Sequence, residues 1–369
     1  MAVKVKSREV LQSITAYPLG KSILDIQKEL GLPMVRNMSE IENVFGCSPL
    51  VKEQLKKSLN QLFHYPDGSS ANLTLKLSEF LGVDQNQLFI GNGSDEIIRL
   101  LLRAFLNHRE EAIMADITFP RYRTNVAIEG GVPILVPLES GVHNLSAMYD
   151  AINRKTKMVF VCNPNNPTGT IVPKSDLIAF IDKVPENILI ILDEAYYEYA
   201  TSEEYLQSIS LLEKYHNLVI LRTFSKVYGL AGLRVGYGIM NSFITSELTK
   251  VKEVFNVNQL GQTAAVVALD DQGFREDCIR QNEEGKAFLE KALHSLGFSY
   301  FPTQSNFMMI HVNIDGNELA EALLNKGIIV KSGKPLGYPE SIRVTISSMD
   351  DNRHFIEALK MAVKECVQP

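Results

Sequence analysis

The five residues Ile188-Leu189-Ile190-Ile191-Leu192 form an uninterrupted apolar run that ends at Asp193. A strand with one solvated face alternates apolar and polar residues, so a continuous run predicts a strand buried on both faces. Similar runs occur at residues 88–90, 112–115, 158–161 and 218–221 and alternate with helix-like segments. This alternation predicts an α/β fold, with a large domain built on a mostly parallel central sheet flanked by helices.

The pattern changes after about residue 260. A long helical stretch at 261–296 is followed by alternating strands at 306–311, 328–331 and 342–346 and by an amphipathic helix at 351–366. These segments predict a smaller α+β domain. We expect an N-terminal arm at residues 1–25, a small domain at 26–46 and 262–369, and a large domain at 47–261, which are ordinary domain sizes.

Composition excludes several functional classes. The 369 residues include 37 Lys and Arg against 43 Asp and Glu, a net charge of −6, and no basic block that would indicate nucleic-acid binding. The four cysteines form no CxxC pair and the seven histidines no HExxH motif, so no metal site is predicted. No apolar stretch approaches the roughly 18 residues of a membrane span, and no signal sequence is visible, so we expect a cytoplasmic protein.

Residues that directly follow each apolar run are the first candidates for a binding site, because ligands of open α/β sheets bind at the carboxyl ends of the strands. Gly91-Asn92-Gly93-Ser94-Asp95 follows the first run and precedes a predicted helix that Ser94 and Asp95 could cap. Such a turn can bind a phosphate through N–H groups at a helix N-terminus, although ordinary strand–helix turns look similar. Glu96 replaces the third glycine of the dinucleotide fingerprint, which argues against an NAD site.

Later loops add amides and titratable groups. The loop 163–170 reads Asn-Pro-Asn-Asn-Pro-Thr-Gly-Thr, and its prolines and glycine make it rigid. Asp193 should be partly buried at its strand end, unless it caps a helix. Lys226 lies in Phe224-Ser225-Lys226-Val227-Tyr228, where apolar neighbours would lower its pKa and make it a candidate Schiff-base nucleophile. A solvated surface lysine is the common alternative.

Together these loops match the needs of pyridoxal 5′-phosphate (PLP). This cofactor requires a lysine for its aldehyde, an acid for its ring nitrogen, donors for its phenolic oxygen, and N–H groups with an arginine for its phosphate. The motifs Asn-Pro-Thr-Gly, Asp-x-x-Tyr, and Ser-Lys followed by Arg-x-Gly-Tyr occur here in that order. In these motifs the chain resembles the fold type I PLP-dependent aminotransferases, above all their histidinol-phosphate aminotransferase branch, and the resemblance covers nearly the whole sequence.

The resemblance implies roles around the cofactor ring. Lys226 would bond to the aldehyde and later move a proton between the substrate's α-carbon and the cofactor. Asp193 would keep the pyridine nitrogen protonated, and Asn166 and Tyr196 would contact the phenolic oxygen. Tyr122 would stack on the ring.

It also implies roles around the phosphate. The residues expected to surround it are Gly93, Ser94, Asp95, Ser225 and Arg234. Tyr65 would reach the phosphate of the other subunit's cofactor, which implies a homodimer.

On the substrate side, the resemblance implies that Arg343 anchors a carboxylate or phosphate, which a guanidinium can hold bidentately. Tyr17, Asn43 and Lys331 would complete the pocket. Four positions depart from the usual family pattern: Ile41 replaces an asparagine, Val44 a proline, Lys331 an arginine and Ser347 a glycine.

The expected reaction is amino transfer from L-histidinol phosphate to 2-oxoglutarate, in histidine biosynthesis. Because all four departures lie on the substrate side, an aromatic amino acid aminotransferase of the same family is the nearest alternative. A PLP-dependent lyase and a non-catalytic regulator are more distant ones; such regulators usually carry an added DNA-binding domain.

Overall fold

The computed structural model describes residues 5–14, 16 and 22–367. Its main sheet has seven strands in the order β2-β8-β7-β6-β5-β3-β4. Their bounds are β2 Leu88–Gly91, β3 Glu111–Ala115, β4 Val132–Val136, β5 Thr156–Cys162, β6 Leu189–Asp193, β7 Leu218–Thr223 and β8 Gly236–Met240. β8 pairs antiparallel with both of its neighbours and the remaining pairs are parallel, which confirms the predicted mostly parallel sheet.

The continuous apolar runs arise because each strand of this sheet is covered on both faces. Along β6, Ile190 and Leu192 point into one hydrophobic cluster and Leu189 and Ile191 into the other. The first cluster is covered by α2 (Pro49–Ser58), α3 (Ala71–Leu81), α6 (Leu145–Asp150), α7 (Lys174–Lys183) and α9 (Gln259–Asp270). The second is covered by α4 (Ser94–Phe105), α5 (Arg121–Glu129) and α8 (Ser242–Val251).

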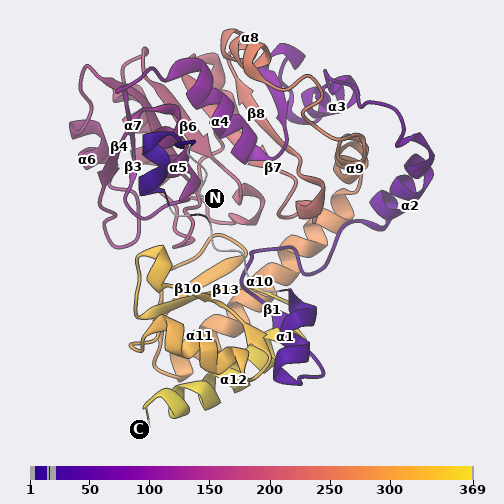
Figure 1. The fold of residues 1–369 in the computed structure, drawn as a ribbon, viewed down its shortest axis with the longest axis vertical. Helices are drawn as coiled ribbons and strands as arrows, with labels where there is room; N and C mark the ends of the chain where they lie inside the picture. Colours follow the sequence, from indigo (N-terminus) through magenta and orange to yellow (C-terminus); the bar gives the residue numbers. More distant parts are fainter. Residues whose placement is uncertain (1–4, 15, 17–21, 368–369) are drawn as a thin grey trace.

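A second, smaller core lies below the first (Figure 1). Its antiparallel sheet has the order β12-β13-β10-β9, and a separate short parallel pair joins β1 to β11. The strands are β1 Arg36–Asn37, β9 Ser299–Tyr300, β10 Phe307–His311, β11 Ile328–Ile329, β12 Lys331–Ser332 and β13 Ser341–Thr345. Its helices are α1 Ile23–Leu30, α10 Gln272–Ser295, α11 Gly316–Leu324 and α12 Met349–Val367.

The N-terminal part of the chain contributes to this smaller core, because Met38 packs there among residues 289–362. Short 3-10 helices complete the described chain: η1 Glu9–Ser13, η2 Leu59–Gln61, η3 Gln85–Gln87, η4 Tyr197–Tyr199, η5 Ile209–Glu213, η6 Ala231–Leu233 and η7 Lys334–Leu336.

Two predictions need correction, one of a helix and one of a domain boundary. The stretch predicted as one helix is two, α9 and α10, with a break at Asp271, whose side chain accepts from the Phe274 N–H at 3.1 Å. Ala264, Ala265 and Ala268 of α9 pack into the core of the large sheet, so the predicted boundary at residue 262 falls too early. α10 then runs from the large sheet into the small domain (Figure 1).

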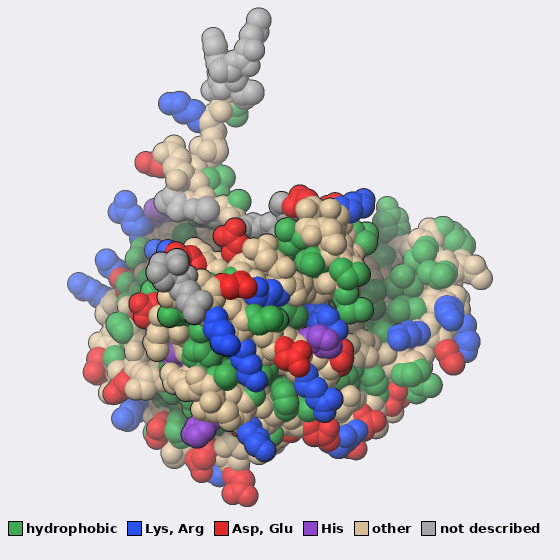
Figure 2. Space-filling model, turned by 90° about the horizontal axis from the view of Figure 1, so that it is seen from below, with side chains coloured by type: hydrophobic (Ala, Val, Ile, Leu, Met, Phe, Trp, Pro, Cys, Tyr) green, Lys and Arg blue, Asp and Glu red, His purple; other side chains and the backbone are tan. Residues whose placement is uncertain are grey.

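The described residues contain no helix long and apolar enough to span a bilayer. Within the same residues, no group of three or more His, Cys, Asp or Glu side chains could hold a metal ion. Seen from the small-domain side, basic and acidic side chains are interspersed over the surface (Figure 2).

Candidate active site

A cavity of about 340 Å³ lies where the carboxyl ends of β5, β6 and β7 meet the N-terminus of α4. Most of the side chains that line it come from four loops predicted to follow the strands. They include Ser94 and Asp95, Asn166, Asp193 with Tyr196, and Ser225, Lys226 and Arg234. The structure therefore brings together residues that are up to 140 positions apart in the sequence.

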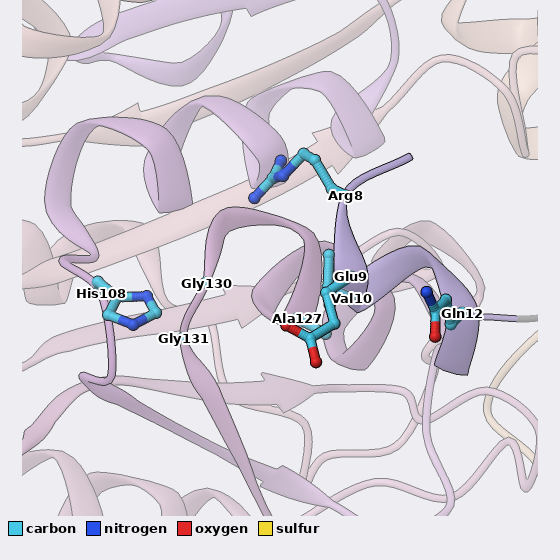
Figure 3. A pocket seen from close by; sticks show the side chains of 8 residues that line it. All are labelled: Arg8, Glu9, Val10, Gln12, His108, Ala127, Gly130 and Gly131. Carbon is cyan, nitrogen blue, oxygen red and sulfur yellow. The ribbon is translucent and has the colours of Figure 1, made fainter. Parts of the chain in front are cut away.

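A larger and more open depression lies at the opposite, amino-terminal ends of β3 and β4. It is formed by η1 and by the turns before those two strands, and its lining includes Arg8, Glu9 and His108 (Figure 3). Arg8 there donates to the carbonyl of Ile128 at 2.7 Å. None of the residues predicted for the site lines this depression, so the strand-end cavity is the candidate site.

Lys226 is the lysine among the residues that line the cavity. Removal from water lowers the pKa of its amine to about 8, the nearby positive charge of Arg343 adds to this, and the carboxylates of Glu42 and Glu40 oppose it. The amine donates to the Ile41 carbonyl at 3.1 Å and lies 5.3 Å from the centre of the Tyr196 ring. An amine with this pKa is neutral in a substantial fraction near pH 8 and can act as a nucleophile or base.

Asp193 is the buried acid of the site, only 3% exposed at the end of β6. Burial raises its pKa to about 6, while hydrogen bonds from Tyr122 and from the Ala195 N–H favour the ionised form. The Tyr122 hydroxyl donates to Oδ2 at 2.6 Å and the Ala195 N–H to Oδ1 at 3.1 Å. Such a carboxylate can share a proton with a ring nitrogen, and it does not cap a helix.

The predicted stacking role of Tyr122 is wrong. Its side chain is 0% exposed, its ring stacks on Phe160 at 4.8 Å between centroids, and it does not line the cavity. Phe119, three residues earlier, lines the cavity and is partly exposed. Because α5 begins at Arg121, Tyr122 already points inward from a helix, whereas Phe119 precedes the helix and faces the cavity.

The end of the cavity next to α4 depends on close packing of Gly93 against Arg234. Gly93 caps α4 with φ 78°, and a Cβ atom there would lie 2.6 Å from Nη2 of Arg234. The Arg234 guanidinium lies 3.4 Å from the Ser225 hydroxyl. The prediction that Ser94 or Asp95 caps the helix is wrong: Gly93 takes that position, and both side chains line the cavity within the first turn.

Asn166 links the cavity to the small domain. Its Oδ1 accepts from Nη1 of Arg343 at 2.7 Å, so its amide group and the guanidinium act as one unit. The other two asparagines of this loop serve the loop itself: Asn163 accepts from the Val172 N–H, and Asn165 donates to Thr168 and to the Ile117 carbonyl. The bonds preceding Pro164 and Pro167 are cis.

Arg343 is buried on β13, where Nη2 also donates to the Ser39 carbonyl at 2.9 Å. Lys331 stands directly opposite it in the β12–β13 register. Directly opposite residues of an antiparallel pair project to the same face, so the two cations share one side of the small sheet. This is the arrangement that a substrate anion would require.

Like Gly93, Tyr122, Lys331 and Arg343, the predicted residues Asn43 and Tyr65 are not among those that line the cavity. Asn43 donates to the Val227 carbonyl at 2.7 Å and thereby supports the loop that carries Lys226. Tyr65 is 81% exposed and stacks on Phe255, so it does not reach the cavity of its own chain. Tyr17 lies outside the described residues.

Sequence reasoning missed Phe119, Glu40 and Glu42 as lining residues. The sequence has two aromatic residues beside Pro120, Phe119 and Tyr122, and either could have been the one that faces the cavity. The two glutamates belong to a segment that precedes the large domain in the sequence. The rule that ligands bind at the carboxyl ends of strands does not show that this segment borders the cavity.

Comparison with known proteins agrees with this geometry. The model of the family "Aminotransferase class I and II" matches residues 34–359. A histidinol-phosphate aminotransferase of Geobacillus sp. (strain WCH70) is 46% identical over 96% of this chain and 97% of its own length. One from Brevibacillus brevis is 47% identical over 97% of this chain and 99% of its own.

A solved structure shares the fold over almost the whole chain. It is the histidinol-phosphate aminotransferase of Sinorhizobium meliloti in complex with PLP, with a TM-score of 0.90 at 24% identity, covering 98% of this chain and 99% of the other. With the family model matching most of the sequence, the chain belongs to the class I and II aminotransferases.

Proposed function

We propose that this chain is a PLP-dependent aminotransferase that transfers the amino group of L-histidinol phosphate to 2-oxoglutarate. The observation that carries the proposal is that Lys226 and Asp193 face one cavity whose Asn166 is hydrogen-bonded to Arg343. A reactive amine, a buried acid and an anion-binding cation thus meet within one site. The Sinorhizobium relative was solved with PLP, which supports the choice of cofactor.

The residues present fit PLP in each part of the cavity. The N-terminus of α4 with Gly93, Ser94 and Asp95, together with Ser225 and Arg234, would hold the phosphate dianion by N–H groups, hydroxyls and a guanidinium. Asp193 would pair with the ring nitrogen, Phe119 would cover the ring face, and Asn166 with Tyr196 would contact the phenolic oxygen.

When bound, PLP supplies an aldehyde that takes up the amino group and a ring that withdraws electrons from the substrate's α-carbon. Lys226 would hold the cofactor through its amine and, as a free amine, would accept the proton and return it. Asp193, whose ionised form is favoured by the Tyr122 hydrogen bond, would favour a positive charge on the ring nitrogen. Arg343 would bind the substrate's anionic group and so orient the substrate in the site.

The substrate assignment is supported by the names of the relatives at 46% and 47% identity and by the two cations on one face of the small sheet. A substrate phosphate and the carboxylates of 2-oxoglutarate are anions, and Arg343 with Lys331 would bind them in turn. We also propose a cytoplasmic location, as expected of a biosynthetic transaminase.

A substrate panel tests the assignment. The PLP-loaded protein is assayed with 2-oxoglutarate and with histidinol phosphate, phenylalanine or tyrosine as amino donor, and kcat/KM is compared. We expect histidinol phosphate to be preferred by at least about tenfold, the discrimination that a well-placed charged contact provides. Preference for the aromatic amino acids would replace the proposed substrate, and product formation over many turnovers without 2-oxoglutarate would indicate a lyase.

We further propose that a second copy of the chain covers the surface around Tyr65. Phe63, Tyr65, Val254 and Phe255 are exposed there side by side with Leu62, an unusual gathering of apolar groups. In a dimer Tyr65 would reach the partner's phosphate site. Sedimentation equilibrium should give twice the 41.3 kDa chain mass, and Phe63→Asp should shift the protein toward monomer.

A further inference from the structure

Ile41 adopts a backbone conformation that isoleucine normally avoids. Its φ is 59°, in the left-handed region, where the branched Cβ crowds the following carbonyl. Residues held in this way persist only where the surroundings fix them, and they cluster at functional sites. Ile41 lies in the segment that crosses the candidate site between Met38 and Asn43.

The surroundings of Ile41 fix it from two sides. Its side chain is 3% exposed and packs with Tyr196 of the large domain and Phe307 of the small domain. Its N–H donates to Oγ1 of Thr345 at 3.1 Å, on the strand that also carries Arg343. Apolar packing and a buried hydrogen bond therefore compensate for the strained backbone.

This conformation sets the direction in which the Ile41 carbonyl points. The oxygen of Ile41 accepts from Nζ of Lys226 at 3.1 Å and from Nδ2 of Asn306 at 3.4 Å. Two residues earlier, the Ser39 carbonyl accepts from Arg343. If residue 41 relaxed to an extended conformation, its carbonyl would turn and Lys226 would lose this acceptor.

We infer that Ile41 is a positioning residue, whose strained backbone holds its carbonyl as the acceptor for the Lys226 amine whenever that amine is not bonded to the cofactor. The inference rests on the proposed function in one respect, that Lys226 is the reacting amine. An amine with one proton donated to a fixed acceptor has a defined orientation, which general acid–base transfer at a nearby carbon requires.

Several other charged groups face the same amine, and the effect of Ile41 adds to theirs. Arg343 and Arg234 disfavour the protonated amine, Glu40 and Glu42 favour it, and the Tyr196 ring, Asp95 and Asp193 also border the cavity. A carbonyl acceptor favours the protonated amine as well. Loss of the Ile41 carbonyl therefore lowers the pKa of Lys226 further, by about 1 unit for a hydrogen bond to a charged group.

The test compares Ile41→Ala with Ile41→Gly. Both remove the buried side chain, but glycine adopts a φ of +59° without strain and alanine does not. In the full-length protein freed of cofactor, trace acetylation with acetic anhydride is followed by peptide mass spectrometry across pH, with exposed Lys57 as internal standard. The readout is the pH at which Lys226 reaches half of its maximal reactivity.

We expect wild type and Ile41→Gly to share this midpoint, and Ile41→Ala to lie about 1 unit lower, a tenfold loss of proton affinity. Equal midpoints for Ala and Gly would overturn the inference, because simple loss of packing affects both alike. If Ile41→Ala fails to fold, Thr345→Val removes the acceptor of the Ile41 N–H at constant volume; it should also lower the midpoint, and an unchanged midpoint would contradict the inference.

The amino-transfer assay of the wild-type holoenzyme reports on the proposed function separately. Absence of transfer would refute that function without altering the comparison of midpoints. Normal transfer together with equal midpoints would refute only the role of Ile41.

Discussion

At the scale of single residues, the charge of a group in the candidate site depends on residues that do not themselves line the cavity. Tyr122 is the clearest case, because the family resemblance assigned it to the cofactor ring, whereas in the structure its hydroxyl donates to Asp193. Its direction was not predictable, because it depends on where α5 begins, and the sequence offered two aromatic residues three positions apart.

We predict that Tyr122→Phe lowers kcat by about tenfold, because a hydrogen bond to an ionised buried group contributes about 1.5–3 kcal/mol. Without this donor the ionised form of Asp193 is less favourable, and its pKa rises above about 6. Steady-state kinetics with saturating substrates measure the effect. Tyr149→Phe, at an exposed position of α6, is the control, and equal kcat values for both variants would disprove this role.

At the scale of elements, most strands were predictable and most loop geometry was not. Runs such as 188–192 can be recognised because burial on both faces leaves no polar position in the strand. The break between α9 and α10 was missed because Asp270-Asp271-Gln272 also suits an exposed helical turn. The turn into α4 was predicted as an anion site, but the need for glycine at position 93 follows from Arg234, which is 141 residues away.

This close approach leads to a prediction for Gly93→Ala. The added Cβ would lie 2.6 Å from Arg234 Nη2 and would displace the guanidinium from the phosphate side of the cavity. We expect the Kd for PLP, measured by fluorescence titration, to rise at least about tenfold, as for loss of one charge-assisted contact.

Gly82→Ala is a matched control for this change. Gly82 also has a positive φ, 68°, and also caps a helix, at the C-terminus of α3. However, no atom lies within 4 Å of its added Cβ. Both variants should lose about 1 kcal/mol of stability from backbone strain. Only Gly93→Ala should lose cofactor affinity, and a similar loss in Gly82→Ala would show that strain alone is responsible.

At the scale of the whole molecule, the sequence predicted two domains and a site at the carboxyl ends of the strands, but not how the segment at residues 39–43 crosses from one domain to the other. Contacts between residues 300 positions apart, such as Ile41 with Thr345, leave no local signal. The same holds for a buried acid near α10: Glu198 lies close to Arg275 and Arg222, yet both oxygens of its carboxyl group lack a hydrogen-bond partner within the described chain.

Burial raises the pKa of Glu198 to about 8, which predicts a pH dependence of stability. A carboxyl group whose pKa is raised by folding makes its full contribution to the free energy of unfolding below its unfolded pKa, near 4.5. That contribution is lost as the pH rises through the folded pKa of about 8. Glu198→Gln removes the titration. The Tm of the variant relative to wild type should therefore increase between pH 5 and pH 8, by on the order of 5 °C.

Glu204→Gln, at an exposed position nearby, is the control and should show a constant difference across this range. A constant difference for Glu198→Gln as well would mean that Glu198 is ionised in the folded protein at both pH values.

Trapping of the cofactor tests the central claim, that Lys226 is the reacting amine. The full chain is loaded with PLP, reduced with sodium borohydride and digested, and the modified peptide is identified by mass spectrometry. We predict that the label is on Lys226 and that Lys226→Ala yields no labelled peptide and no amino transfer. Labelling of another lysine, or transfer at the wild-type rate by Lys226→Ala, would contradict the account.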